Sequence, residues 1–308
     1  MHKLARTLHL NISSRNRFYN PPYFRKEGII KMLDIDLLNK KCIDIRKLIV
    51  NQIGGLGVGH IGGSLSVVEL LVYLYYHEMN IDPKNPDMEG RDRFIMSKGH
   101  GGPALYSVLA DKGYFSIEEL DTLNKPGTNL PSHCDMLKTR GVDMTTGSLG
   151  QGLSCAVGMA LGSKIKSDDA YIYCLLGDGE IQEGQIWEAA MAAGHFKLNR
   201  LIVFLDYNKM QISGTVEEIM DIEPVIDKWK SFNWNVYRAN GHNINGIHKS
   251  VIEAKKSKDK PTMIILDTIK GKGVSFAEEA KVLSHSMTIS EDMRIKAIKE
   301  LDSEVDNL

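Results

Sequence analysis

The sequence predicts an α/β fold in which a doubly wound, mostly parallel sheet carries helices on both faces. After Gly150, short apolar runs alternate with longer segments whose apolar residues recur at helical spacing. This alternation is typical of right-handed βαβ units and therefore of a parallel sheet. Several apolar runs end directly in glycine, aspartate or asparagine, as expected at the ligand-binding edge of such a sheet. A length of 308 residues is sufficient for one large domain of this kind.

The first half of the chain has the less regular pattern. Apolar residues between Leu33 and Ile49 recur at helical intervals and predict a helix. Ser116 followed by Glu119 is typical of a capping box. The other expected elements are a glycine-rich loop at 54–63, a helix at 66–79, a strand at 94–96, a helix at 104–112 and a long loop at 124–148.

The second half alternates between strand and helix patterns. The charged segment from Glu291 onward is expected to be helical. The expected elements before it are a helix at 152–165, a strand at 170–176, a helix at 183–196, strands at 201–206 and 234–238, a helix at 244–256 and a strand at 262–268.

Residues 1–31 differ in composition from the rest of the chain. They hold seven basic residues and a single acidic one, Glu27. Such a segment fits a transit peptide, an arm that contacts a partner, or an extension upstream of a translation start at Met32. The pair Pro21-Pro22 and the lack of a clean amphipathic period favour an arm or extension. We therefore expect a basic extension at 1–31 and one α/β domain at 32–308.

The composition excludes several classes of function. A formal net charge of −1 gives no basis for binding to nucleic acid or to a membrane surface. No apolar stretch approaches the roughly 18 residues that a membrane helix needs. The spacing of the cysteines excludes a CxxC zinc site and predicts reduced thiols in a cytoplasmic protein. These cysteines are Cys42, Cys134, Cys155 and Cys174.

The segment Gly177-Asp178-Gly179-Glu180 carries the strongest chemical signal. It follows one apolar run, and Asn208 follows the apolar run at 201–205. Two buried strands would thus deliver a carboxylate and an amide oxygen at the ligand-binding edge of the sheet. Such oxygens suit Mg²⁺ or Ca²⁺, and Mg²⁺ usually binds together with phosphate. The helix expected near Glu183 adds N–H groups for phosphate oxygens. A tight turn is the alternative interpretation, but the combined pattern predicts a metal-held diphosphate.

Histidines form a second signal. Four of the ten lie in loops rich in glycine, proline or serine: His60, His100, His133 and His285. Imidazoles in such loops bind phosphates or sugar hydroxyls and transfer protons near neutral pH; isolated structural histidines are the alternative. The segment 146–152 is either a helix start with close packing or a backbone surface against a flat ligand.

Six segments together resemble transketolase, specifically its thiamine-diphosphate-binding N-terminal half, and extend in register over residues 33–290. The resemblance implies the thiamine-diphosphate-binding fold, with this chain as its diphosphate-binding domain. The segments are GHIGGSLSVVELL (59–71), RDRFIMSKGHGGPALYSVLADKGYF (91–115), TGSLGQGLSCAVGMALG (146–162), GDGEIQEGQIWEAA (177–190), LDYNKMQISG (205–214) and KGKGVSF (270–276).

The resemblance implies a role for each matching residue. Mg²⁺, for which Ca²⁺ or Mn²⁺ can substitute, would be held by Asp178, Asn208 and the backbone carbonyl of Met210. Glu183 matches a family position at the subunit interface that links paired cofactor sites. The catalytic residues lining the substrate channel would be His60, His133 and His285. Thiamine diphosphate would contact His100, Gly147, Leu149, Gly177, Asp178, Gly179, Asn208 and Ile212.

The sequence departs from the family at three points. Tyr207 replaces the first of two asparagines found in many thiamine sites, and Ser286 stands where the family usually has glycine. Whole transketolases are also much longer and carry a domain that binds the aminopyrimidine of the cofactor. The resemblance therefore implies a split enzyme. This chain would be inactive alone and would pair with a C-terminal subunit in a dimer of heterodimers.

The implied reaction transfers a two-carbon ketol unit from a ketose or ketose phosphate to an aldose acceptor. A split transketolase for a sulfonated or branched ketose would have nearly the same sequence, so the donor stays open. Thiamine-dependent alternatives are deoxyxylulose-phosphate synthase and the α subunit of a 2-oxo acid dehydrogenase, but SKGHGGPALY and QEGQIWEAA favour transketolase. A non-catalytic paralogue is disfavoured because Asp178, Asn208 and His100 are intact.

Overall fold

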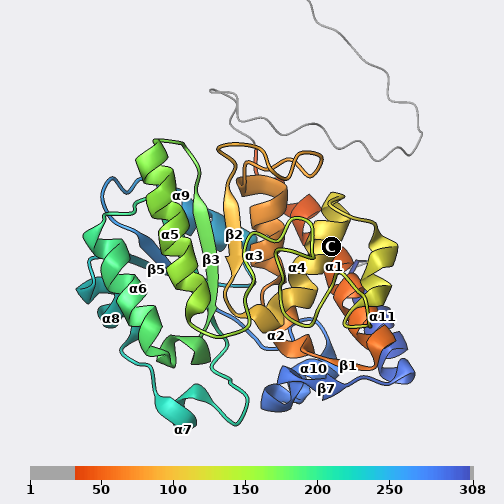
Figure 1. The fold of residues 1–308 in the computed structure, drawn as a ribbon. Coiled ribbons are helices and arrows are strands. Elements are labelled where there is room, and N and C mark those ends of the chain that lie inside the picture. The colour runs from red at the N-terminus through yellow and green to blue at the C-terminus, as the bar shows by residue number, and fades with distance from the viewer. Residues whose placement is uncertain (1–31, 306–308) are drawn as a thin grey trace, which may run out of the picture.

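A five-stranded parallel sheet forms the centre of the molecule (Figure 1). The computed structural model describes residues 32–305, so the predicted extension at 1–31 lies outside the described residues. The strands, in sheet order, are β2 (Arg93–Met96), β3 (Ile172–Gly177), β4 (Leu201–Tyr207), β6 (Thr262–Asp267) and β5 (Asn235–Asn240). Every pairing in this sheet is parallel, which confirms the predicted α/β fold.

Helices cover both faces of the sheet. Within residues 32–305 they are α1 (Ile35–Leu56), α2 (Ile61–Leu65), α3 (Val68–Tyr73), α4 (Gly102–Lys112), α5 (Gln151–Lys166), α6 (Gly184–His195), α7 (Val216–Met220), α8 (Val225–Ser231), α9 (Ile244–Lys255), α10 (Ser275–Glu279) and α11 (Glu291–Val305). In that part of the chain no helix is both long and apolar enough to cross a membrane. A short antiparallel pair joins β1 (Val58–Gly59) to β7 (Met287–Thr288).

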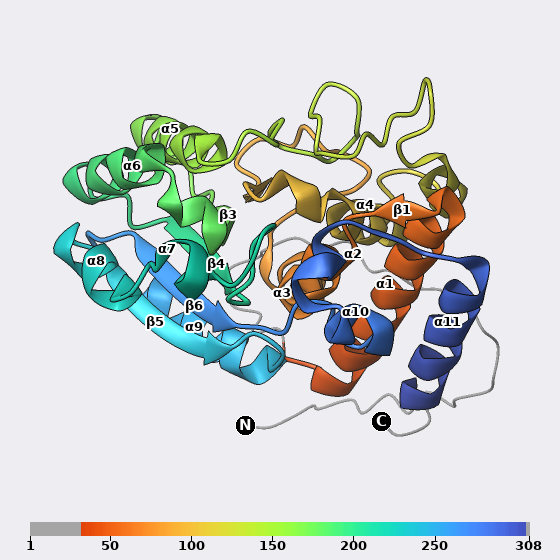
Figure 2. The same ribbon diagram turned by 90° about the horizontal axis from the view of Figure 1, so that it is seen from below.

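The alternation of side chains along each strand separates two apolar cores. On β3, Tyr173 and Leu175 enter one core together with residues of α1, α3, α4 and α9. Cys174 and Leu176 enter the other core, with residues of α5, α6 and α8. Figure 2 shows α5 and α6 on one side of the sheet and α1 and α3 on the other. Because both faces are covered, the strands are apolar throughout, as parallel strands usually are.

The expected helix at 66–79 is present over 68–78, whereas the expected loop at 54–63 is wrong in part. The helix consists of α3, which continues directly into a π-helical turn η1 (Leu74–Glu78), and the short helix α2 precedes it. The hydroxyl of Ser66 donates to the carboxylate of Asp206 (2.8 Å). This tertiary bond holds residue 66 at the break between α2 and α3. Helix α1 also continues through part of the supposed loop and ends at Gly57, whose φ of 87° is a left-handed cap.

The predicted capping box at Ser116 is wrong. A 3₁₀ helix, η3 (Ile117–Thr122), begins there without a side-chain cap. The carboxylate of Glu119 accepts instead from the amide of Asn129 (3.0 Å), across the following loop. A complete capping box is present at Thr215 and Glu218, where α7 begins.

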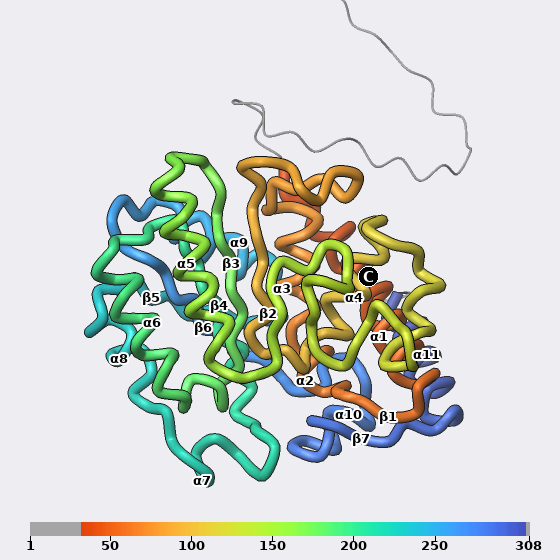
Figure 3. The backbone as a smooth tube through the Cα atoms, in the orientation of Figure 1, coloured from red at the N-terminus to blue at the C-terminus, as the bar shows by residue number. Residues whose placement is uncertain are grey.

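The long loop at 124–148 has no helix or strand, as predicted. The hydroxyl of Tyr106 in α4 donates to the carbonyl of Pro131 (2.9 Å), and Thr146 donates to the carbonyl of Met96 at the end of β2 (2.7 Å). Figure 3 shows the loop in yellow-green beside α4. These bonds bring His133 and Gly147 to the carboxyl edge of the sheet.

Packing around α6 gives a test of the fold. A Cβ added to Gly194 would lie 2.0 Å from the carbonyl oxygen of Phe232, so Gly194→Ala must displace backbone. We expect it to lower the free energy of unfolding by about 2–3 kcal/mol, as overpacking does. Gly158 in α5 has open space around its Cα, so Gly158→Ala should raise that free energy by about 0.5–1 kcal/mol. Urea unfolding of the full chain measures both; equal midpoints would contradict the described packing.

Candidate functional site

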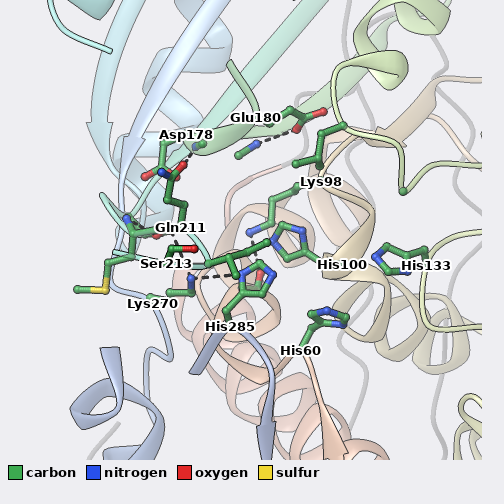
Figure 4. A pocket seen from close by; sticks show the side chains of 18 residues that line it. His60, Lys98, His100, His133, Asp178, Glu180, Gln211, Ser213, Lys270 and His285 are labelled. Atoms are coloured by element: carbon green, nitrogen blue, oxygen red, sulfur yellow. Dashed lines mark hydrogen bonds between the residues drawn. The ribbon is translucent and has the colours of Figure 1, made fainter. Parts of the chain in front are cut away.

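A cavity of about 400 Å³ lies where the carboxyl ends of the strands meet the histidine loops (Figure 4). The structure brings to it every predicted cofactor, metal and substrate residue except Glu183. It adds residues that the sequence argument did not select. The lining residues are His60, Gly63, Lys98, His100, His133, Gly147, Leu149, Gly177, Asp178, Gly179, Glu180, Asn208, Met210, Gln211, Ile212, Ser213, Lys270 and His285.

Asp178 lies directly beyond β3, at the start of the 3₁₀ helix η4 (Gly179–Gln182). Its carboxylate accepts from the N–H of Gly179 (2.8 Å) and from the N–H of Lys209, just beyond β4. Burial and the neighbouring Asp206 carboxylate raise the pKa of Asp178 to about 7. A positive ion in this cavity would remove that penalty, because it favours the ionised carboxylate.

Asn208 lies one residue beyond β4, and its amide is fixed at both ends. The amide nitrogen donates to Asp206 (3.0 Å), and the amide oxygen accepts from the N–H of Met210 (3.0 Å). Burial alone would raise the pKa of Asp206, but the Lys98 ammonium and hydrogen bonds to the carboxylate hold it below its usual value. Because the ionised Asp206 can only accept hydrogen bonds, it directs the Asn208 nitrogen toward itself and the oxygen away.

These oxygens fit a hard divalent cation. Asp178 offers a carboxylate, Asn208 an amide oxygen and Met210 a backbone carbonyl, and all three residues line the same cavity. Mg²⁺ prefers few protein oxygens supplemented by water and phosphate. No group of three or more His, Cys, Asp or Glu side chains suited to a metal occurs within residues 32–305, so a transition-metal site has no support there.

The four predicted histidines converge. The ring of His60 lies 5.4 Å from the rings of His133 and His285 and 5.8 Å from that of His100, and the rings of His100 and His285 are 4.8 Å apart. They come from loops that are far apart in sequence, and Figure 4 shows them along one side of the cavity. The sequence left open whether these residues are isolated; the structure places them in one cluster.

The histidine cluster is neutral at neutral pH. Burial, followed by His133 and Lys270, lowers the pKa of His60 to about 4. Burial and Lys270 lower the pKa of His285 to about 3. Burial lowers the pKa of His133, and burial together with Lys98 lowers that of His100 well below its usual value. Neutral imidazoles both donate and accept hydrogen bonds, which suits sugar hydroxyls.

Two buried lysines in the cavity were missed by the sequence argument. The ammonium of Lys98 donates to the carbonyl of Gly63 (2.8 Å) and pairs with Asp206. The ammonium of Lys270 lies 3.3 Å from the carbonyl of Met210. Burial and Lys98 lower the pKa of Lys270 to about 8. Both lysines follow a strand by two or three residues, and this position at the carboxyl edge could have identified them.

Glycine backbone forms another wall of the cavity. A Cβ on Gly99 would lie 2.7 Å from the backbone nitrogen of Gly147. The two loops therefore meet backbone to backbone, and Gly147 has a φ of 141° that favours glycine. Leu149 follows as a half-buried lining residue. The segment 146–152 thus shows the predicted helix start with close packing, since a Cβ on Gly152 would lie 2.4 Å from Ser97. The alternative, a surface against a flat ligand, stays a prediction.

Glu183 lies apart from the cavity. It is the N-cap residue of α6, without a side-chain capping bond, and is exposed. Its predicted place at a subunit interface stays a prediction.

Comparisons with known proteins agree with this geometry. Residues 38–302 match the family described as transketolase, thiamine diphosphate binding domain. The chain is 57% identical over 270 residues to the 6-deoxy-6-sulfo-D-fructose transketolase subunit SqwG of Clostridium sp. (strain MSTE9), covering 88% of this chain and 98% of that protein. It is 38% identical over 276 residues to an apulose-4-phosphate transketolase subunit of Phocaeicola vulgatus, and the match covers 90% of this chain and 98% of that protein.

A solved structure of similar fold is the transketolase of Pichia stipitis. It superposes with a TM-score of 0.81 at 32% identity, covering 87% of this chain and 41% of that one. The match thus spans less than half of that transketolase. The chain belongs to the transketolase family, whose thiamine diphosphate-binding domain matches residues 38–302.

Proposed function

We propose that this chain is the diphosphate-binding subunit of a two-chain transketolase that uses Mg²⁺ and thiamine diphosphate. The observation that carries the proposal is the cavity itself. It combines three oxygen donors for a metal, a glycine surface for flat rings and a cluster of neutral histidines. The reaction would transfer a two-carbon ketol unit from a ketose to an aldose.

The residues at the strand ends would hold the cofactor. Asp178, Asn208 and the carbonyl of Met210 would bind Mg²⁺, with Ca²⁺ or Mn²⁺ as substitutes. The Gly177–Gly179 turn would lie against the diphosphate, and the Lys270 ammonium would bind its oxygens because it presents positive charge to the cavity. When bound, thiamine diphosphate supplies the carbanion chemistry of the transfer.

The histidines would bind the sugar and transfer its protons. His60, at the centre of the cluster, together with His133 and His285, would donate hydrogen bonds to ketose hydroxyls or accept from them. A neutral imidazole accepts a hydroxyl proton without first losing its own, so these residues can move protons between sugar oxygens. His100, in the loop that follows β2, would contact the diphosphate end of the cofactor.

The second subunit would supply the aminopyrimidine site. The relative from Clostridium, of which 98% is covered, is itself named a subunit. The cofactor would then lie between two chains, in a dimer of heterodimers with Glu183 at the interface. A cytoplasmic location suits the four free cysteines of the chain.

The donor sugar has two candidates. A ketose phosphate is the general transketolase donor, whereas 57% identity to a protein named for 6-deoxy-6-sulfo-D-fructose favours a sulfonated ketose. Identity to the relative named for apulose 4-phosphate is lower, at 38%.

Reconstitution separates these candidates. We expect the chain to be inactive alone and active when mixed with a C-terminal transketolase subunit, Mg²⁺ and thiamine diphosphate. The kcat/KM for 6-deoxy-6-sulfo-D-fructose should be compared with that for xylulose 5-phosphate in the same preparation. A higher value for the sulfonated sugar would select the second candidate, and activity of the chain alone would contradict the two-chain proposal.

Asp178→Ala tests the metal ligand. We expect it to weaken metal-dependent binding of thiamine diphosphate by at least about 100-fold, because it removes the anionic ligand. Calorimetric titration with the second subunit present measures the change. Asp169→Ala is the control. This exposed carboxylate lies just before the first residue of β3, at the end of the strand away from the cavity, and pairs with Arg200. Equal affinity of the two variants would refute the assignment.

Metal binding should depend on pH through the same carboxyl. The pKa of Asp178 is about 7, so below that pH a proton must leave before the metal binds. At saturating thiamine diphosphate, the half-saturating Mg²⁺ concentration should be constant above pH 7 and should rise by up to about tenfold per pH unit below it. Titration of Mg²⁺ with thiamine diphosphate alone corrects for the phosphate groups. A flat profile through pH 7 would contradict the buried, protonatable carboxyl.

A further inference from the structure

Glu180 is a buried carboxylate that the proposed mechanism does not use. It lies in η4, and only 2% of its surface is exposed. One carboxylate oxygen accepts from the hydroxyl of Ser97 (2.5 Å) and from the N–H of Gly150 (3.0 Å). The other oxygen accepts from the N–H of Gly177 (3.0 Å). Two of its three bonds are therefore made to backbone.

The three donors come from three different walls of the cavity. Ser97 lies just beyond β2, in the loop that carries His100. Gly150 follows Leu149 in the glycine surface, and Gly177 ends β3 immediately before the predicted metal ligand. A single side chain thus connects the diphosphate turn, the surface for the cofactor rings and the histidine loop.

Close packing fixes the relative position of the segments that Glu180 connects. A Cβ on Gly152, in the first turn of α5, would lie 2.4 Å from the hydroxyl oxygen of Ser97. The start of α5 therefore rests directly on Ser97, and neither segment can shift without moving the other. The glycine surface and the histidine loop consequently share one fixed arrangement, in which the Glu180 carboxylate is the common acceptor.

The three donors require acceptors on both carboxylate oxygens of Glu180. Burial raises the pKa of Glu180 although the bonds from Ser97, Gly150 and Gly177 act to lower it. A carboxamide has one accepting oxygen, so Glu180→Gln would turn an NH₂ group toward at least one of the donors. A buried N–H left without an acceptor costs about 1–3 kcal/mol unless the loop moves. Movement of either loop would displace groups that line the cavity.

We propose that Glu180 is a positioning residue for thiamine diphosphate, holding the turn before Asp178, the glycine surface and the His100 loop in their binding arrangement. The inference rests on the proposed function, because it concerns the same cofactor. It assigns Glu180 no contact with the reacting atoms. Its effect should therefore be on cofactor affinity.

The test compares two buried carboxylates. Asp92 is 1% exposed and accepts from the N–H groups of Asn80 and Tyr171 (2.8 Å each) at the opposite edge of the sheet. Glu180→Gln and Asp92→Asn therefore make the same chemical change in similar surroundings. Each is measured in the full chain with its second subunit, at a temperature at which circular dichroism finds all variants folded.

We expect Glu180→Gln to raise the Kd for thiamine diphosphate at saturating Mg²⁺ by at least about tenfold. Asp92→Asn should lower the thermal midpoint but leave that Kd within about twofold of wild type, since its damage lies away from the cavity. Equal Kd values for the two variants would overturn the inference. Wild-type protein that binds no thiamine diphosphate would overturn the proposed function and the inference together.

A second variant tests the positioning role of Glu180 if Glu180→Gln does not fold. Ser97→Ala removes one donor and leaves both backbone bonds to the carboxylate. We expect its Kd for thiamine diphosphate to lie above that of Asp92→Asn by about threefold or more. A Kd equal to that of Asp92→Asn would overturn the inference.

Discussion

The cavity depends on one buried ion pair, between Lys98 and Asp206. In the sheet order, β3 lies between the strands that carry these residues. Lys98 therefore reaches across the end of β3. A Cβ added to Gly177, the last residue of β3, would lie 3.7 Å from the Cβ of Lys98. The same Asp206 carboxylate also accepts from Ser66, Asn208 and Thr268. Buried pairs contribute little net stability because both ions lose water, so the main consequence of this pair is geometric: it fixes four segments around one carboxylate.

The charges in the cavity suit the proposed diphosphate and metal. Two buried lysines face Asp178 and Asp206, while the histidines stay neutral because burial and the lysines disfavour their protonated forms. Protonated histidines would add positive charge to that side of the cavity and could no longer accept hydroxyl protons. Lys270 and Asp178 both have pKa values shifted toward their neutral forms. Each would regain its charge beside the opposite charge of a bound diphosphate or metal.

The sequence identified the parts of the fold in which local pattern and tertiary structure agree. Buried parallel strands are apolar throughout, so the sequence places β3, β4 and β6 within two residues, together with the candidate ligand residues at their ends. The separate helix α2, which ends just before Ser66, was not predicted; the bond from Ser66 to Asp206, 140 residues away, is a tertiary contact that local periodicity does not contain. The sequence predicts only that Glu180 belongs to a turn. Its role as a shared acceptor cannot be predicted, because its donors come from three separate loops. The positions of Lys98 and Lys270 near strand ends can be read from the sequence. Their burial cannot, because it depends on the assembled sheet.

Diffraction with a metal that scatters anomalously tests the central claim most directly. Crystals of the chain with its second subunit, Mn²⁺ and thiamine diphosphate would locate the ion independently of any assumed ligand. We expect one strong anomalous peak within coordination distance of the Asp178 carboxylate, the Asn208 amide oxygen and the Met210 carbonyl, with the diphosphate on its open side. A diphosphate bound in the cavity with the ion held by other residues, or with no ion at all, would contradict it.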